Sequence, residues 1–511
     1  MAIYRNPILP GFHPDPSICR VGRDFYLATS SFEYFPGVPL FHSRDLVHWQ
    51  PIGHALTRPS QLNLDGVPSS GGIYAPTLRH FRGRFFMVTT HVNGGGNFYV
   101  TAKNARGPWS DPVRLDEGGI DPSIDFADGT AWYTRNGKGK DFDHPEIHQA
   151  PFDLKKGAIV GPVRPVWPGT GGIWPEGPHL YKMGATYYLL TAEGGTGYEH
   201  SIVVGRSASP SGPFEPCPFN PILTHRDSPR HPIQATGHAD FVELDDGTTW
   251  AVLLGIRPTG GRHHHLGRET FLAPVTFTKD GWPRIGERGR VELRMRGPSL
   301  PRHPFPSPPV RDDFDARDLS PTWSMLRNPE PGSISLARRR GFLRLAGTAV
   351  TLDEVGAPAF VGRRQEHFRV ACRAALEFEP RGHGEEAGLT VRANERFHYD
   401  LAVGLGREGR TATLRASTRA KTRNVARVTL RPGPLVLELR ATEERYAFAV
   451  RTGQRRLPLG ELPTRGLSAE TVGAGGPNYF TGAFIGLYAT GNGAASTASA
   501  DFDWFDYEPG R

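Results

Sequence analysis

A four-residue string that occurs twice constrains the fold of this chain most strongly. Asp-Pro-Ser-Ile stands at residues 15–18 and again at residues 121–124. Each copy leads to a glycine and then to a segment rich in aromatic residues, the pattern of a strand, a tight turn and a second strand. Repetition of a whole hairpin predicts a fold assembled from similar units, in which equivalent positions come together.

Three further segments follow the same pattern less closely. They open near Tyr74, Pro175 and His238, and each reaches a glycine followed by a strand rich in aromatic and branched residues. Units spaced about 45 to 65 residues apart have the size of propeller blades, whose innermost strands line a common axis. The sequence therefore predicts an all-β fold that begins with a five-bladed β-propeller.

Carboxylates stand at the opening of three units. Asp15, Asp121 and Glu176 hold this position in units one, three and four, and Asp240 lies near it in unit five, just after His238. A single Asp-Pro is more often only the start of a turn. Three acids at corresponding positions instead favour a cluster at the axis, where carboxyl groups can act as acid and base.

Composition and breakers divide the chain into two domains. The 511 residues include 62 Gly and 47 Pro, which suits many short strands joined by turns. Residues 297–310 are too rich in proline to continue a sheet and should form a stiff, extended linker. Beyond them the repeat disappears and short alternating strands follow. We predict a propeller at 1–296, a linker at 297–310 and an antiparallel β-sandwich at 311–511.

Several function classes are disfavoured. The sequence contains no run of about 18 apolar residues, so no membrane-spanning segment is predicted. The net charge is +8, but the basic residues are spread among acidic ones, so nucleic acid is not an expected partner. Cys19, Cys217 and Cys372 are far apart and are expected to be buried free thiols. Free thiols, together with the lack of an apolar leader after Met1, predict a cytoplasmic protein, although a mature secreted form remains an alternative. The tract His263–His265 is expected to be a solvated loop.

A set of motifs along nearly the whole chain resembles glycoside hydrolase family 43. The resemblance is to the branch of two-domain β-xylosidases and α-L-arabinofuranosidases, whose second domain is a concanavalin-like sandwich. It rests on residues 6–17, 30–38, 43–49, 176–182, 192–196, 236–240, 266–271, 312–315 and 480–484.

The resemblance implies roles for the three acids. Asp15 is expected to be the general base that activates water, and Glu176 the general acid that protonates the departing oxygen. Asp121 is expected to orient the substrate and to raise the pKa of the acid. Such an inverting site needs two carboxyl groups about 6.5–9.5 Å apart, with room for water between them. The acid must stay protonated near neutral pH, which burial and a nearby like charge favour.

The resemblance also suggests residues that bind substrate. Arg268 is similar to a substrate-binding arginine, and His238 to an axial histidine near an ion or water, although a buried histidine with a structural role is an equal alternative. Phe32 and Tyr74 are candidates for aromatic walls. Phe480 resembles a residue that the second domain inserts toward the active site, which would close the cleft into a pocket. Many relatives have Trp where Tyr74 stands, which leaves the preference between xylose and arabinose open.

The expected function is an exo-acting, inverting glycosidase that releases β-D-xylose, α-L-arabinofuranose or both from small xylan-derived oligosaccharides. Two alternatives are a propeller that binds glycans without cleaving them and a retaining enzyme that cleaves sucrose or fructan. The latter would carry a Trp-Met-Asn-Asp-Pro-like opening, whereas this chain has Phe-His-Pro-Asp-Pro at residues 12–16. We expect no required cofactor. A structural calcium ion, the linkage cleaved and assembly into a homo-oligomer remain open.

Overall fold

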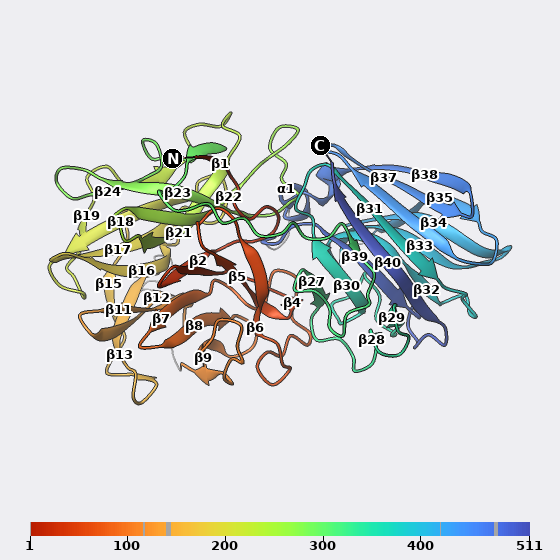
Figure 1. Cartoon of the computed structure of the whole chain (residues 1–511), viewed down its shortest axis with the longest axis horizontal. Helices are drawn as coiled ribbons and strands as arrows, with labels where there is room; N and C mark the ends of the chain where they lie inside the picture. Colours follow the sequence, from red (N-terminus) through yellow and green to blue (C-terminus); the bar gives the residue numbers. More distant parts are fainter. Residues whose placement is uncertain (1, 116–117, 139–144, 420, 475–478, 511) are drawn as a thin grey trace.

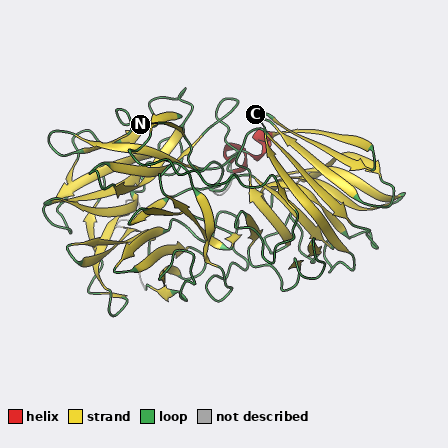
Figure 2. Ribbon diagram, in the orientation of Figure 1, coloured by secondary structure: helices red, strands yellow, loops and turns green. Residues whose placement is uncertain are grey.

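Two β domains lie side by side in the computed structural model (Figure 1). The structure describes residues 2–115, 118–138, 145–419, 421–474 and 479–510. Within these ranges, helix is confined to the 3₁₀ turn η1 (Thr464–Leu467) and the single turn α1 (Ala469–Val472), as Figure 2 shows. No helix in the described ranges is long and apolar enough to cross a membrane. The predicted all-β fold class is confirmed.

The first domain is a five-bladed propeller, as predicted. Each blade is an antiparallel sheet whose first strand lies innermost. Blade one contains β2 (Ser17–Val21), β3 (Asp24–Ala28), β5 (Gly37–Ser43) and β6 (Gln50–Leu56). Blade two contains β7 (Thr77–Phe81), β8 (Arg84–His91), β9 (Gly96–Ala102) and β10 (Val113–Arg114). Blade three contains β11 (Ile120–Ala127), β12 (Thr130–Lys138), β13 (Pro145–Asp153), β14 (Ala158–Ile159) and β15 (Arg164–Trp167).

Blade four contains β16 (Glu176–Met183), β17 (Thr186–Glu193), β18 (Ser201–Ser207), β19 (Glu215–Pro216) and β20 (Leu223–Thr224). Blade five contains β21 (Gln234–Glu243), β22 (Thr249–Ile256), β23 (Glu269–Phe277) and β24 (Pro283–Ile285). The innermost strands β2, β7, β11, β16 and β21 contact one another in a ring. Contact between β2 and β21 closes this ring. The N-terminal segment also joins the end of the domain, because β1 (Ile3–Arg5) pairs with β25 (Arg294–Arg296) and Leu9 bridges to Thr270.

A guanidinium group ties the blades together at the axis. Arg79 on β7 donates to Asp125 on β11 at 2.8 Å and to both oxygens of Asp240 on β21 at 2.6 and 2.9 Å. Asp240 also accepts from the hydroxyl of Ser17 at 2.6 Å and from the amide of Ile18 at 2.9 Å. Asp240 is therefore a cross-link between blades, and its position near the repeated acids does not place it in their cluster.

The second domain is a sandwich of two antiparallel sheets. One sheet contains β26 (Arg311–Asp312), β28 (Ile334–Ser335), β29 (Leu343–Ala346), β31 (Val370–Glu377), β36 (Leu435–Ala441), β37 (Arg445–Thr452), β38 (Arg455–Pro463) and β40 (Ser499–Pro509). The other contains β27 (Trp323–Leu326), β30 (Ala359–Arg364), β32 (Glu386–Asn394), β33 (Phe397–Gly406), β34 (Gly409–Thr418), β35 (Lys421–Thr429) and β39 (Phe484–Thr490). Alternate residues point into the core between them; on β31 these are Val370, Cys372, Ala374 and Leu376. The three cysteines are free and buried, as predicted.

The two domains share a sheet. The short strand β4 (Tyr34–Phe35) comes from the propeller segment, yet it pairs with β27 and extends the second sheet of the sandwich. Directly after β27, the amide of Arg327 donates to Glu33 O at 2.9 Å, and its buried guanidinium donates to Val67 O at 2.6 Å. Main-chain pairing of this kind fixes the relative position of the domains.

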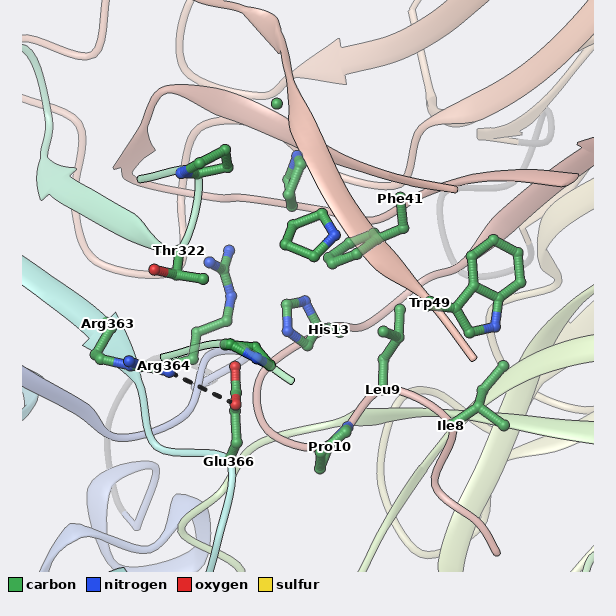
Figure 3. Close-up of a pocket in the computed structure, with 15 residues that line it drawn as sticks. Ile8, Leu9, Pro10, His13, Phe41, Trp49, Thr322, Arg363, Arg364 and Glu366 are labelled. Atoms are coloured by element: carbon green, nitrogen blue, oxygen red, sulfur yellow. Dashed lines mark ion pairs between the residues drawn. The ribbon is translucent and has the colours of Figure 1, made fainter. Parts of the chain in front are cut away.

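A cavity of about 170 Å³ lies between the domains (Figure 3). His13 and Trp49 line it on the propeller side, and Arg363, Arg364 and Glu366 line it on the sandwich side. The Arg364 guanidinium donates to Phe12 O at 2.6 Å. The sandwich therefore holds the backbone that leads into Asp15.

Candidate active site

A small pocket of about 90 Å³ opens at the propeller axis. It gathers the eight residues singled out in the sequence, together with three neighbours. Its lining consists of Asp15, Phe32, Tyr74, Ala75, Ile120, Asp121, Glu176, Thr196, His238, Arg268 and Phe480. Acids from blades one, three and four thus meet an arginine from blade five and an aromatic ring from the sandwich.

The strand openings explain how the acids reach the axis. Asp15 and Asp121 both have a left-handed backbone, with φ of 53°, just before a proline. In blade four this conformation belongs to Gly177, with φ of 56°, so Glu176 stands one residue earlier than the other two acids. The pairing of β16 with β17 shifts register between Glu176 and His179, which is a bulge that re-aims the side chain. The three acids are therefore neighbours in space but not strict equivalents.

Asp15 is held by charge-assisted hydrogen bonds. Arg268 donates to its two oxygens at 2.9 and 3.4 Å, and the Ser30 hydroxyl donates at 2.6 Å. The Nδ1 atom of His238 lies 4.0 Å from the same carboxylate. These donors fix the direction of the carboxylate oxygens, which a base acting on a single water molecule requires.

Glu176 and Asp121 lie in surroundings that favour protonation. Burial raises the pKa of Glu176 to about 7, helped by the charge of Asp15 and opposed by Arg268. Burial, and then repulsion from Glu176 and Asp15, raises the pKa of Asp121 well above its usual range. The carboxyl cluster therefore retains protons near neutral pH, as proton donation to a leaving group requires.

Three aromatic rings form one wall of the pocket. The centroid of Phe32 lies 5.2 Å from that of Tyr74 and 5.8 Å from that of Phe480, and Tyr74 and Phe480 are 6.0 Å apart. The Arg268 guanidinium lies 5.6 Å from the ring centre of Phe32 and 5.5 Å from that of Phe480. Burial raises the pKa of Tyr74 to about 12, so its phenol keeps its proton.

Phe480 reaches the pocket from the sandwich and is fixed on both sides of its peptide. Its amide donates to the Ser70 hydroxyl at 2.9 Å, and its carbonyl accepts from Arg268 at 3.3 Å. The Ser70 amide in turn donates to the buried Glu33 carboxylate at 3.0 Å. Residues of both domains thus complete the pocket.

Two contributors were not singled out in the sequence. Thr196 accepts a hydrogen bond from Arg268 at 2.8 Å and lies inside a motif that was noted only for its resemblance. His200 lies with Nε2 3.9 Å from Glu176, and burial lowers its pKa to about 3. Its ring packs on Gly237, where an added β-carbon would lie 2.2 Å from the imidazole. The glycine between Thr236 and His238 was therefore the sequence feature that could have indicated a ring packed there.

Two carboxylates near the axis are already held by an arginine. No group of three or more His, Cys, Asp or Glu within the described ranges is arranged to hold a metal. Calcium prefers several oxygen ligands, and the axial carboxylates of Asp125 and Asp240 already bind Arg79. His238 packs its ring on Gly177, and burial lowers its pKa to about 4, so it is a neutral neighbour of Asp15.

The histidine tract differs from its prediction. Instead of forming a solvated loop, it contacts the sandwich: His263 lies 3.1 Å from the Ser468 hydroxyl and His264 lies 2.8 Å from the Glu470 carboxylate. His265 is buried against Phe368. The sequence prediction was wrong here because the contact is made between residues about 200 positions apart.

Comparison with known proteins agrees with this architecture. The family described as glycosyl hydrolases family 43 matches residues 4–283, and a β-xylosidase C-terminal concanavalin A-like domain matches residues 311–508. A non-reducing end α-L-arabinofuranosidase of Bacteroides ovatus is 48% identical over 509 residues, covering 99% of this chain and 94% of the relative. A xylosidase/arabinosidase of Butyrivibrio fibrisolvens is 40% identical over 527 residues, covering 99% and 100%.

Among solved structures, the Bacteroides ovatus xyloglucan PUL GH43B superposes with a TM-score of 0.95 at 48% identity, covering 99% of this chain and 100% of that one. The similarity spans both domains and includes the segments that build the pocket. The chain therefore belongs to glycosyl hydrolase family 43.

Proposed function

We propose that this enzyme removes single terminal sugars from small oligosaccharides, with α-L-arabinofuranose as the preferred sugar and β-D-xylose as the second. The observation that carries the proposal is the pocket itself, where three carboxyl groups and Arg268 lie behind an aromatic wall that the sandwich completes. A pocket of this kind accepts the end of a sugar chain, whereas cleavage within a chain needs an open groove.

The mechanism we propose is a single displacement with inversion. Asp15, oriented by Arg268 and Ser30, takes a proton from water as the water attacks the anomeric carbon. Glu176 gives its proton to the glycosidic oxygen as the bond to the leaving group breaks. Asp121 orients the sugar, while burial and the charge of Asp15 keep the acid protonated. Each turnover leaves Asp15 protonated and Glu176 ionised, and exchange with water restores both.

The preference for arabinofuranose is supported by the relatives. The one at 48% identity is named for that activity alone, and the one at 40% is named for both activities. Terminal xylose and arabinofuranose present similar hydroxyl groups, so activity on both is chemically reasonable. Comparing kcat/KM for an aryl α-L-arabinofuranoside with that for an aryl β-D-xyloside tests the preference, and equal or reversed values would overturn it.

Stereochemistry separates the proposal from its alternatives. Proton NMR of the first turnovers of an aryl β-D-xyloside should show α-xylose before mutarotation mixes the anomers. Initial β-xylose would indicate a retaining enzyme. Binding of the sugar with no turnover of either glycoside would indicate a propeller that only binds glycans.

A further inference from the structure

Two large apolar side chains stand exposed immediately before the general acid. Ile173 is 58% exposed and Trp174 is 53% exposed, and Glu176 follows two positions after the tryptophan. They are the only adjacent pair among the large apolar residues exposed in the described part of the chain. Exposed apolar groups that lie together beside a cleft indicate a binding surface.

The loop that carries this pair is firmly held. The Glu193 carboxylate accepts from the amide and hydroxyl of Thr170, at 2.6 and 2.7 Å, and from the amide of Gly172 at 3.2 Å. The amide of Gly194 donates to Ile173 O at 2.8 Å. Trp174 itself has a left-handed backbone, with φ of 51°, which is unusual for a bulky residue. The exposure of the indole is therefore a property of a fixed loop.

The indole also packs on a segment that leads into the pocket lining. It packs on Gly195, where a β-carbon would come within 2.7 Å of the tryptophan ring. The next residue, Thr196, lines the pocket and accepts from Arg268. The indole therefore contacts the residue just before Thr196, and it stands two positions before Glu176 in the chain.

We propose that Trp174 is the platform on which the sugar of the leaving group packs. The inference rests on the proposed function. A general acid must face the oxygen that joins the terminal sugar to the next unit, so that next unit lies on the Glu176 side, just outside the pocket. The apolar face of a pyranose ring matches an indole, and Ile173 extends the surface. Trp174 would then select oligosaccharides over simple glycosides.

The test compares substrates with and without a second sugar. One is the disaccharide in which the preferred terminal sugar is linked to xylose, and the other is the fluoride of the same sugar. For Trp174→Ala, the ratio of kcat/KM values, disaccharide over fluoride, should fall about ten-fold relative to the wild type. Trp174→Phe should recover most of the ratio. Phe277→Ala, which removes an exposed aromatic ring from β23, should leave the ratio unchanged.

Equal losses on both substrates would mean that Trp174 shapes the pocket for the terminal sugar, and an unchanged ratio would mean that the ring does not meet the substrate; either result overturns the inference. A displaced Glu176 would also lower the ratio, because the disaccharide depends more on the acid than the fluoride does. In that case binding of the disaccharide would be unchanged, which would likewise overturn the inference. A binding experiment keeps this separate from the proposed function. In the inactive Asp15→Ala protein, calorimetry should show that Trp174→Ala weakens binding of the disaccharide but not of the free terminal sugar. If the wild type hydrolyses neither substrate, the proposed function fails, while this binding difference still decides the role of Trp174.

Discussion

At the scale of single residues, the position of Arg268 makes the surroundings of Asp15 and Glu176 different. Arg268 binds both oxygens of Asp15 but makes no ion pair with Glu176 among those described. Glu176 is half-buried and has no such arginine partner, and desolvation is the main cause of its raised pKa. This difference suits the two carboxyl groups to the opposite tasks that we propose for them, Asp15 as base and Glu176 as acid.

The acid role of Glu176 predicts a dependence on the leaving group. Glu176→Gln cannot donate a proton, so hydrolysis of a disaccharide, whose alkoxide leaves poorly, should fall about 100-fold or more. Hydrolysis of a nitrophenyl glycoside should fall much less, because nitrophenolate leaves without protonation. Asp15→Ala serves as the comparison, since loss of the base should affect both substrates. Equal losses in Glu176→Gln would remove this residue from the acid role.

The raised pKa of Glu176 also predicts the pH dependence. Since the protonated acid is the active form, kcat/KM for a disaccharide should decline as pH rises through about 7. In Glu176→Gln, this decline should disappear from the pH profile of the remaining activity on the disaccharide. A profile that keeps its alkaline limb in Glu176→Gln would assign the limb to another group.

The same pKa shift has a consequence for stability. A carboxyl whose pKa rises from 4.5 to about 7 on folding destabilises the folded state increasingly as pH rises through this window. Glu176→Gln removes that cost, so its gain in melting temperature over the wild type should be larger at pH 8 than at pH 4. Calorimetry at the two pH values measures the difference. A gain that is larger at pH 4 would contradict the assignment.

At the scale of elements, two loops from different domains support each other across the pocket. In the propeller loop, Ser70 has a left-handed backbone, with φ of 64°. Its amide donates to the Glu33 carboxylate, and its hydroxyl accepts from the Phe480 amide. Phe480 in turn packs on Phe32 and Tyr74. The aromatic wall is therefore positioned through a chain of hydrogen bonds that begins in the propeller.

This arrangement predicts separate effects of Phe480→Ala on kinetics and on stability. Phe480 is only half-buried, so its truncation should change the melting temperature little, whereas truncation of a core phenylalanine costs about 3–5 kcal/mol. The KM for small glycosides should rise, since the wall no longer excludes water. Ser70→Ala should produce a weaker form of the same kinetic change. Normal kinetics in both variants would show that the sandwich does not shape the site.

The repeated hairpins made the elements predictable, but not every contact between them. Local turn and strand signals sufficed for the five blades, and the verbatim repeat pointed to Asp15 and Asp121. Nothing local indicated that Gly177 would take the left-handed position and displace Glu176 by one residue. The pairing of β4 with β27 was likewise missed, because Tyr34 and Leu326 are far apart in sequence and meet only when both domains are folded.

At the scale of the whole molecule, the shared sheet makes the two domains one unit. The strand β4 leaves the propeller after Phe32, a pocket residue, and joins the sandwich at β27. Arg364 on β30 holds the backbone of Phe12, shortly before Asp15. Contacts that stabilise the interface thus also position the site, so loss of the interface should cost activity as well as stability.

Arg327 provides the sharpest test of this coupling. Its guanidinium is fully buried and donates to Val67 O in the propeller at 2.6 Å and to Gly356 O in the sandwich at 2.7 Å. Arg327→Ala would leave both carbonyls without a partner, at a cost of about 1–3 kcal/mol for each buried group. We expect a lower melting temperature and reduced turnover, whereas Arg317→Ala, at an exposed position, should change neither.

Calorimetry of the wild type should show one transition, because a sheet built from both domains cannot melt in one of them alone. Two well-separated transitions, or an Arg327→Ala protein that loses stability but keeps full activity at low temperature, would show that the interface and the site are independent.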